Sequence, residues 1–236
     1  MKTLIETDEV KVAKKIEEVV DISKGKLPSE YFYSSLPLCV IDSVFSIGVK
    51  YESVRNTVKR YSSYFGINPL RESEEHPSIK VQISIDEFVR SFEELGDEFY
   101  TTEIFKNKQR TSPTNGILKS QAVYQFCKVL QRYKVNYFQG LKKVIGNEEF
   151  EKDIRDIRGQ KSGISLVYFY MLAGDKELIK PDRMIIGFLE ECLQRKISLE
   201  EAQDLLEKTS AVLFENYKNI NPRLLDYLIW NYYRSL

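Results

Sequence analysis

The chain has 236 residues, a length that fits one large domain or two small ones around a sizeable core. Hydrophobic residues make up 42%, charged residues 30% and aromatic residues 12%, which excludes a disordered chain, a fibrous repeat and a disulfide-stapled mini-protein. No apolar stretch reaches the length of a membrane span, and the N-terminus turns acidic from Glu6 without a signal-peptide core. We therefore expect a cytoplasmic protein that does not bind membranes.

The zero net charge of the chain hides an uneven distribution of its 35 basic and 35 acidic residues. Residues 1–100 carry 13 basic and 18 acidic side chains, a net charge of −5, and residues 164–236 carry 9 and 11, a net charge of −2. Residues 101–163 carry 13 basic and only 6 acidic side chains, a net charge of +7. Either this middle segment binds a polyanion, or it forms a solvated basic face that acidic neighbours balance.

Apolar residues recur at helical spacing along most of the chain. In chain order, these stripes predict helices around residues 12–20, 41–48, 51–61, 85–92, 123–130, 185–192 and 225–232. Residues 66–80 and 106–116 are rich in loop-forming residues, and a short alternating stretch from Ile79 is interpreted as an extended linker. The sequence therefore predicts an all-α protein with about ten helices.

Side chains that begin helices support this assignment. Residues 84–87 and 198–201 both place a serine three positions before a glutamate, the pattern of a capping box. Asn221 and Pro222 have the residue types preferred at an N-cap and at the first helical position.

Metal and cofactor chemistry finds little support in the sequence. Cys39, Cys127 and Cys192 are far apart and lie in apolar helical patterns, so we expect three reduced core thiols. His76 is the only histidine, which disfavours a catalytic triad or a histidine metal site. The chain also has no phosphate-binding glycine loop, zinc-type cysteine spacing or EF-hand pattern. We therefore expect neither a metal nor a cofactor.

The most specific signal lies in residues 147–173. An amphipathic helix places Phe150, Ile154 and Ile157 on one face, and the tight turn 158–161 follows it. A second, apolar helix is predicted to start at Ser162-Gly163, so the two helices form a hairpin. The first backbone amides of the second helix have no partner within it, and they favour an anion such as a backbone phosphate.

This hairpin resembles the helix-hairpin-helix motif of the endonuclease III-like DNA glycosylase superfamily. Two apolar residues, a Gly-apolar-Gly turn and a small residue define the family pattern. Here the matching residues are Ile154, Ile157, Gly159, Gln160 and Ser165, while Lys161 stands where the second glycine is usual. The resemblance covers most of residues 30–195 in order and spacing, so the chain looks like a divergent member.

The resemblance implies a two-lobed helical fold made by residues 1–236. Residues 30–135 would form a six-helix-type lobe, and residues 1–29 with 136–236 would form the lobe that contains the hairpin. The family's clustered C-terminal cysteines are absent here, so no iron–sulfur cluster is expected.

The resemblance also implies a catalytic role for Asp182, which follows Pro181 and lies 23 residues after Gly159. In the family, such an aspartate stabilises the positive charge that develops on the sugar and activates water. From the residues alone, an aspartate beside a proline at a helix start is equally well explained as an N-cap. Gly163 occupies the position of the lysine nucleophile of bifunctional members, so the resemblance implies attack by water, the monofunctional mode.

Double-stranded DNA is the partner that the resemblance implies. The hairpin residues expected to contact it are Arg158, Gly159, Gln160, Lys161, Ser162 and Gly163. A wider footprint would add basic residues of the middle segment, namely Lys106, Lys108, Arg110, Lys119, Lys128, Arg132, Lys134, Lys142 and Lys143. For Lys142 and Lys143, ordinary surface positions are the favoured interpretation.

Three functions follow from these features. The first is a monofunctional DNA glycosylase that hydrolyses the N-glycosidic bond of a flipped base. The second is a catalytically inactive helix-hairpin-helix protein that binds DNA. The third is a structural or partner-binding helical protein in which the hairpin only packs.

Overall fold

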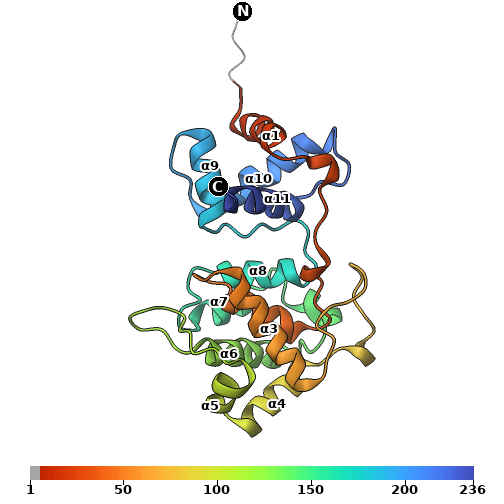
Figure 1. Cartoon of the computed structure of the whole chain (residues 1–236), viewed down its shortest axis with the longest axis vertical. Helices are drawn as coiled ribbons and strands as arrows, with labels where there is room; N and C mark the ends of the chain where they lie inside the picture. Colours follow the sequence, from red (N-terminus) through yellow and green to blue (C-terminus); the bar gives the residue numbers. More distant parts are fainter. Residues whose placement is uncertain (1–5) are drawn as a thin grey trace, which may run out of the picture. The chain divides into compact units, whose positions relative to one another are not determined.

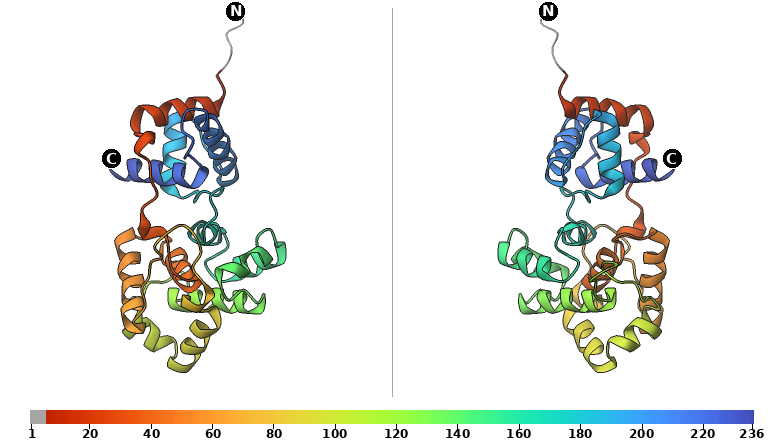
Figure 2. Two further views of the ribbon diagram at one scale, coloured as in Figure 1. Left: turned by 90° about the vertical axis from the view of Figure 1, so that its right-hand side faces the viewer. Right: turned by 90° about the vertical axis from the view of Figure 1, so that its left-hand side faces the viewer.

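The computed structural model describes residues 6–236. The first five residues of the predicted hairpin-containing lobe, which are also the start of the N-terminus discussed above, lie outside the described residues. The chain divides into two compact units, which Figures 1 and 2 show as ribbons. Ser29–Gly174 forms the inserted unit, and Met1–Pro28 with Asp175–Leu236 forms the terminal unit. No residue in 6–236 lies in a β-strand, and the only β pairings there are isolated bridges. The predicted all-α class is therefore confirmed.

The inserted unit is built around one fully buried helix, α2, all of whose residues are shielded from solvent. A helix that is apolar on nearly every side has to be enclosed by its neighbours. The helices of this unit are α2 (Leu36–Phe45), α3 (Tyr51–Phe65), α4 (Ile85–Leu95), α5 (Asp97–Phe99), α6 (Lys119–Arg132), α7 (Glu148–Asp156) and α8 (Ile164–Leu172). Short 3₁₀ turns at Ser29–Tyr31, Ile79–Val81 and Phe138–Lys143 and a π-turn at Tyr100–Ile104 complete it.

The division between the units differs from the predicted one at residues 136–174. The prediction groups this segment with the chain termini, whereas the structure groups it with residues 29–135. The apolar helix α8 packs on α2, and the ring of Phe169 lies 5.1 Å from that of Phe126 on α6. The hairpin therefore shares its core with α2 and α6 because its second helix has no polar face to leave in water.

Lys119, one of the basic residues expected on a wide DNA footprint, is buried at the first position of α6. Its Nζ donates hydrogen bonds to the carbonyl oxygens of Phe45 and Ile47, at 2.9 and 2.7 Å. These carbonyls lie at the C-terminal end of α2, where backbone acceptors lack partners within the helix and attract a cation. Lys119 thus stabilises the end of α2 and is not part of a surface patch.

The terminal unit joins segments from both ends of the sequence. Its helices are α1 (Asp8–Val19), the 3₁₀ turn Ile22–Lys24, α9 (Arg183–Leu193), α10 (Leu199–Phe214) and α11 (Pro222–Arg234). The predicted stripe of α1, with Val12 and Ile16 fully buried, packs into one hydrophobic cluster with Leu189 of α9, Leu206 of α10 and Ile229 of α11.

Most of the predicted helix starts are confirmed by their hydrogen bonds. Ser84 and Glu87 form the complete reciprocal capping box of α4. The Ser198 side chain accepts from an amide of α10, and Asn221 does the same for α11, with Pro222 at its first turn. The stretch from Ile79, predicted as an extended linker, is instead a 3₁₀ turn, whose Ser78 side chain accepts from a backbone amide.

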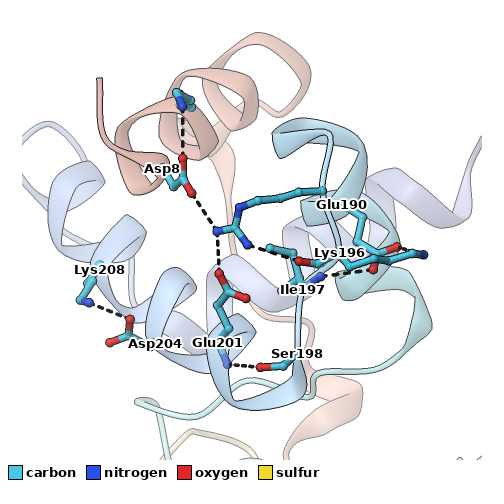
Figure 3. A network of polar contacts seen from close by, with 10 residues as sticks. Asp8, Glu190, Lys196, Ile197, Ser198, Glu201, Asp204 and Lys208 are labelled. Atoms are coloured by element: carbon cyan, nitrogen blue, oxygen red, sulfur yellow. Dashed lines mark hydrogen bonds and ion pairs between the residues drawn. The ribbon is translucent and has the colours of Figure 1, made fainter. Parts of the chain in front are cut away.

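An ion-pair cluster ties the helices of the terminal unit together at their polar edge (Figure 3). The NH2 atom of Arg195 lies 2.8 Å from Asp8 of α1 and 2.5 Å from Glu201 of α10. The neighbouring Lys196 pairs with Glu190 of α9 at 2.9 Å. These pairs are largely exposed, so they orient helix ends more than they stabilise the fold.

Candidate nucleic-acid interface

The predicted hairpin is present as α7 and α8, and its connection is longer than predicted. Asn147 caps α7 by accepting from the Phe150 amide at 3.0 Å, and Phe150 and Ile154 bury the apolar face of the helix. The helix ends at Asp156 and α8 begins at Ile164, so residues 157–163 replace the predicted four-residue turn. Figure 2 shows α7 beside α6 at one edge of the unit.

Two glycines give this connection its path. Gly159 and Gly163 have φ angles of 91° and 75°, in the left-handed region that side chains with a Cβ avoid. Lys161 is not among the residues with positive φ. The second left-handed position of the turn therefore falls on Gly163, so a lysine at the family's second glycine position causes no backbone strain here.

Two of the predicted contact residues lie inside the connection. Gln160 is only 1% exposed, and its Oε1 accepts a hydrogen bond from Ser165 at the start of α8. Gly163 is buried as well, because the guanidinium of Arg155 lies 3.1 Å from where a Cβ would stand. Gln160 and Gly163 are expected from the sequence to contact DNA, whereas both lie beneath the surface and stabilise the turn.

The other four predicted contacts, Arg158, Gly159, Lys161 and Ser162, are exposed. Neither Arg158 nor Lys161 lies within ion-pair distance of a carboxylate in the described part of the chain. The cations of α7 are paired, Lys152 with Asp156 at 2.6 Å and Arg155 with Glu151 at 3.6 Å. Unbalanced positive charge at the hairpin is therefore concentrated in the connection.

A shallow groove of about 670 Å³ runs along α7 to this connection. Besides Ile157 and Gly159, its lining consists of charged side chains: Glu148, Glu151, Lys152, Arg155, Asp156, Arg158 and Lys161. The charges of two ion pairs, Lys152 with Asp156 and Arg155 with Glu151, cancel within the groove. The remaining charges give it an acidic end at Glu148 and a basic end at the connection.

Other basic residues of the middle segment have local partners. Lys128 pairs with Glu93 at 3.2 Å, and Arg132 pairs with Asp153 at 2.6 Å. For these two cations, the sequence interpretation of a basic face balanced by acidic neighbours describes the structure.

Asp182, the predicted catalytic residue, is the N-cap of α9 in the terminal unit. Its Oδ1 accepts from the amides of Met184 and Ile185, at 2.8 and 3.3 Å. The capping interpretation of this aspartate is therefore confirmed. A half-buried carboxylate held by two backbone amides also keeps lone pairs free for a second partner.

Sequence reasoning missed Asp226, a buried neighbour of Asp182. It lies on α11, and its Oδ1 accepts from the Lys180 amide at 2.9 Å. Burial, and then the nearby Asp182 carboxylate, raise the pKa of Asp226 to about 8. The sequence feature that points to this burial is the position of Asp226 directly after Leu225, within the apolar stripe of a helix.

A second buried carboxylate, Asp42 of α2, was also missed. The hydroxyl groups of Tyr33 and Tyr51 donate to its Oδ2, at 2.7 and 3.3 Å. Burial, with a further contribution from Asp42, raises the pKa of both tyrosines well above the ordinary value, so both phenols keep the protons that they donate. Tyr31 stacks on Tyr51, which makes these aromatic residues part of a closed core network.

The described residues include no group of three metal-ligating side chains. Cys39 and Cys127 are buried and Cys192 is half-buried, all three as free thiols. Nε2 of His76 donates to the Ala173 carbonyl at 2.6 Å, and its ring stacks on Phe138. Among residues 6–236, no helix is long and apolar enough to cross a membrane.

The chain matches the model of a protein family. The model of a family described as a domain of unknown function (DUF8548) matches residues 10–234, a range that includes parts of both units. No curated protein and no solved structure matches the chain.

Proposed function

We propose that the chain, which belongs to the DUF8548 family, binds the phosphate backbone of double-stranded DNA. The description of the family names no activity, so the proposal rests on the residues of the chain itself. The observation that carries this proposal is the connection 157–163 at the N-terminus of α8. It exposes Arg158 directly before the left-handed Gly159, and Lys161 and Ser162 between Gly159 and the left-handed Gly163. Unpaired amides at a helix start attract phosphate, and the two cations add a charge that no described carboxylate cancels. Such contacts position a protein on DNA without reading its sequence.

Salt dependence tests this proposal. Arg158→Glu combined with Lys161→Glu should weaken duplex binding and reduce the slope of log K against log salt by about two, roughly one for each phosphate that is no longer neutralised. Fluorescence anisotropy with a labelled duplex at several salt concentrations measures that slope. Both side chains are exposed, so thermal unfolding should be unchanged.

The matched control is Lys142→Glu combined with Lys143→Glu, the same charge change on exposed side chains of another segment. It should leave the slope close to that of the wild type. If the wild type does not bind duplex DNA at low salt, or if both variant pairs behave alike, the hairpin is only architecture. The structural or partner-binding helical protein would then be the favoured interpretation.

A second candidate function is hydrolysis of an N-glycosidic bond, and the pair Asp182 and Asp226 favours it. Burial and the Asp182 carboxylate raise the pKa of Asp226 to about 8, which keeps a neutral acid next to Asp182. Glycoside hydrolysis through a cationic transition state uses a pair of carboxyl groups, one of which is a carboxylic acid with a raised pKa. Asp182 would stabilise the developing charge and activate water.

Asp182→Asn separates this function from binding alone. Asparagine is as good an N-cap as aspartate, so α9 should stay intact while the carboxylate is removed. On a panel of duplexes with damaged bases, base release should fall by a factor of about 10² or more, with duplex affinity unchanged. If the wild type releases no base from any substrate, the catalytically inactive DNA-binding protein remains.

A further inference from the structure

The loop 106–116 lies directly against the hairpin connection. A Cβ on Gly159 would come within 2.3 Å of the Thr111 side chain, so Thr111 occupies the space that only a glycine leaves open. Figure 1 shows this yellow-green loop at the same edge of the inserted unit as the path from α7 to α8. Two segments almost 50 residues apart in sequence are therefore in contact at the predicted interface.

Hydrogen bonds hold the loop in one conformation. The amide of Thr111 donates to the Ile117 carbonyl at 2.9 Å, and that of Lys119 donates to the Gln109 carbonyl at 2.8 Å. Nε of Arg110 donates to the Gly116 carbonyl, also at 2.9 Å, which closes the tip. A loop that is already ordered loses little conformational entropy when it binds a ligand.

The base of the loop is equally fixed. Phe105 is fully buried among aromatic rings, and the next residue, Lys106, has a φ of 48°, an uncommon left-handed value for a residue with a side chain. NH1 of Arg60 donates to the carbonyls of both residues at 3.1 Å. Strained backbone of this kind persists only where the surroundings impose it, and it is found most often at functional sites.

The loop carries positive charge without local compensation. Lys106, Lys108 and Arg110 are exposed, and no carboxylate among residues 6–236 lies within ion-pair distance of them. Lys128, Arg132, Lys152 and Arg155, which follow in the same basic segment, all have acidic partners. The unpaired cations of the segment therefore include those on both sides of the Thr111–Gly159 contact.

We propose that the loop 106–116 is a second phosphate-binding element, seated on the hairpin so that both hold the backbone of the same DNA duplex. This inference rests on the proposed function and extends it from one contact point to two. Cations on two backbone segments of fixed conformation would fix the orientation of the duplex, which a single turn with two charges does not. The substrate class is a double-stranded polyanion with regularly spaced phosphates.

Four proteins test the inference with one duplex DNA and one salt series. They are the wild type, the hairpin variant Arg158→Glu with Lys161→Glu, the loop variant Lys106→Glu with Lys108→Glu, and the combination of the two pairs. Each pair should reduce the salt slope by about two, and the combination by about four, because each neutralised phosphate contributes roughly one to the slope. The Lys142→Glu, Lys143→Glu pair is again the matched control.

The possible failures are distinguishable. A loop variant with the wild-type slope, next to a hairpin variant with a reduced slope, overturns the inference and leaves the proposed function intact. A wild type without salt-dependent binding to duplex DNA, or with binding to duplex RNA only, overturns both. Thermal unfolding of the loop variant at the wild-type temperature verifies that weaker binding does not come from unfolding, since neither lysine side chain is buried.

Discussion

Replacing Lys119 with methionine is expected to destabilise the inserted unit by about 2–6 kcal/mol. Methionine keeps the unbranched stem but leaves the buried carbonyl of Phe45 and the part-buried carbonyl of Ile47 without their donor. Each buried acceptor that is deprived of its donor costs about 1–3 kcal/mol. Chemical denaturation followed by far-ultraviolet circular dichroism measures the change, because this unit holds most of the helices.

Lys128→Met on the same helix is the matched control. Lys128 is exposed and pairs with Glu93 at the surface, so its removal should change the free energy of unfolding by no more than about 1 kcal/mol. Equal midpoints for the two variants would show that the Lys119 ammonium contributes nothing beyond its stem.

Asp226→Asn should make the terminal unit more stable at neutral pH, and more so as the pH rises. The buried carboxyl has a pKa of about 8 in the folded state and an ordinary value of 3.8 when exposed. Between these values the folded state holds a proton that the unfolded state releases. The free energy of unfolding of the wild type should therefore fall by about 1.4 kcal/mol per pH unit over this range.

The sign follows from the groups around Asp226. Burial and the Asp182 carboxylate oppose its ionisation, and Lys180 and Arg223 offset them only in part. The stability that protonated Asp226 provides is complete below about pH 4 and is lost as the pH rises through about 8. Asparagine has no proton to lose and keeps the oxygen that accepts from the Lys180 amide.

Fluorescence of Trp230, the only tryptophan, reports unfolding of the terminal unit directly because it lies on α11. The difference between variant and wild type should be close to zero at about pH 4 and reach several kcal/mol at about pH 8. Asp204→Asn on α10, which removes an exposed partner of Lys208, serves as control with a small effect. Stability curves for Asp226→Asn and wild type that run parallel with pH would rule out a perturbed carboxyl.

Features set by a few neighbouring residues could be predicted from the sequence. The capping box of α4, the serine N-cap of α10, the Asn221-Pro222 start and the apolar stripes depend on contacts within one or two helical turns, so the residue types reveal them directly. The second predicted capping box, at 198–201, is only half formed, because the Glu201 carboxylate pairs with Arg195. The same holds for the cap at Asp182, where the local interpretation stands beside the catalytic one.

Features set by distant partners could not be predicted. The residue type of Lys119 favours the surface, whereas its partners lie more than 70 residues earlier in the chain. The extent of the inserted unit depends on α8 packing against α2, and the burial of Gln160 depends on Ser165 and on the actual length of the connection. Contact between Thr111 and Gly159 likewise follows from packing that no local pattern encodes.

The interruption of the terminal unit by Ser29–Gly174 has a consequence for the order of events on the ribosome. Helix α1 emerges early, but its main partner α10 ends at Phe214, almost 200 residues later. At ordinary rates of synthesis, the apolar face with Val12 and Ile16 waits roughly 10–40 s for that partner. All residues of the inserted unit are available once Gly174 has emerged, so this unit can complete its core before α10 is synthesised. During that time the apolar face of α1 has no partner within the chain and is open to chaperones that bind nascent chains.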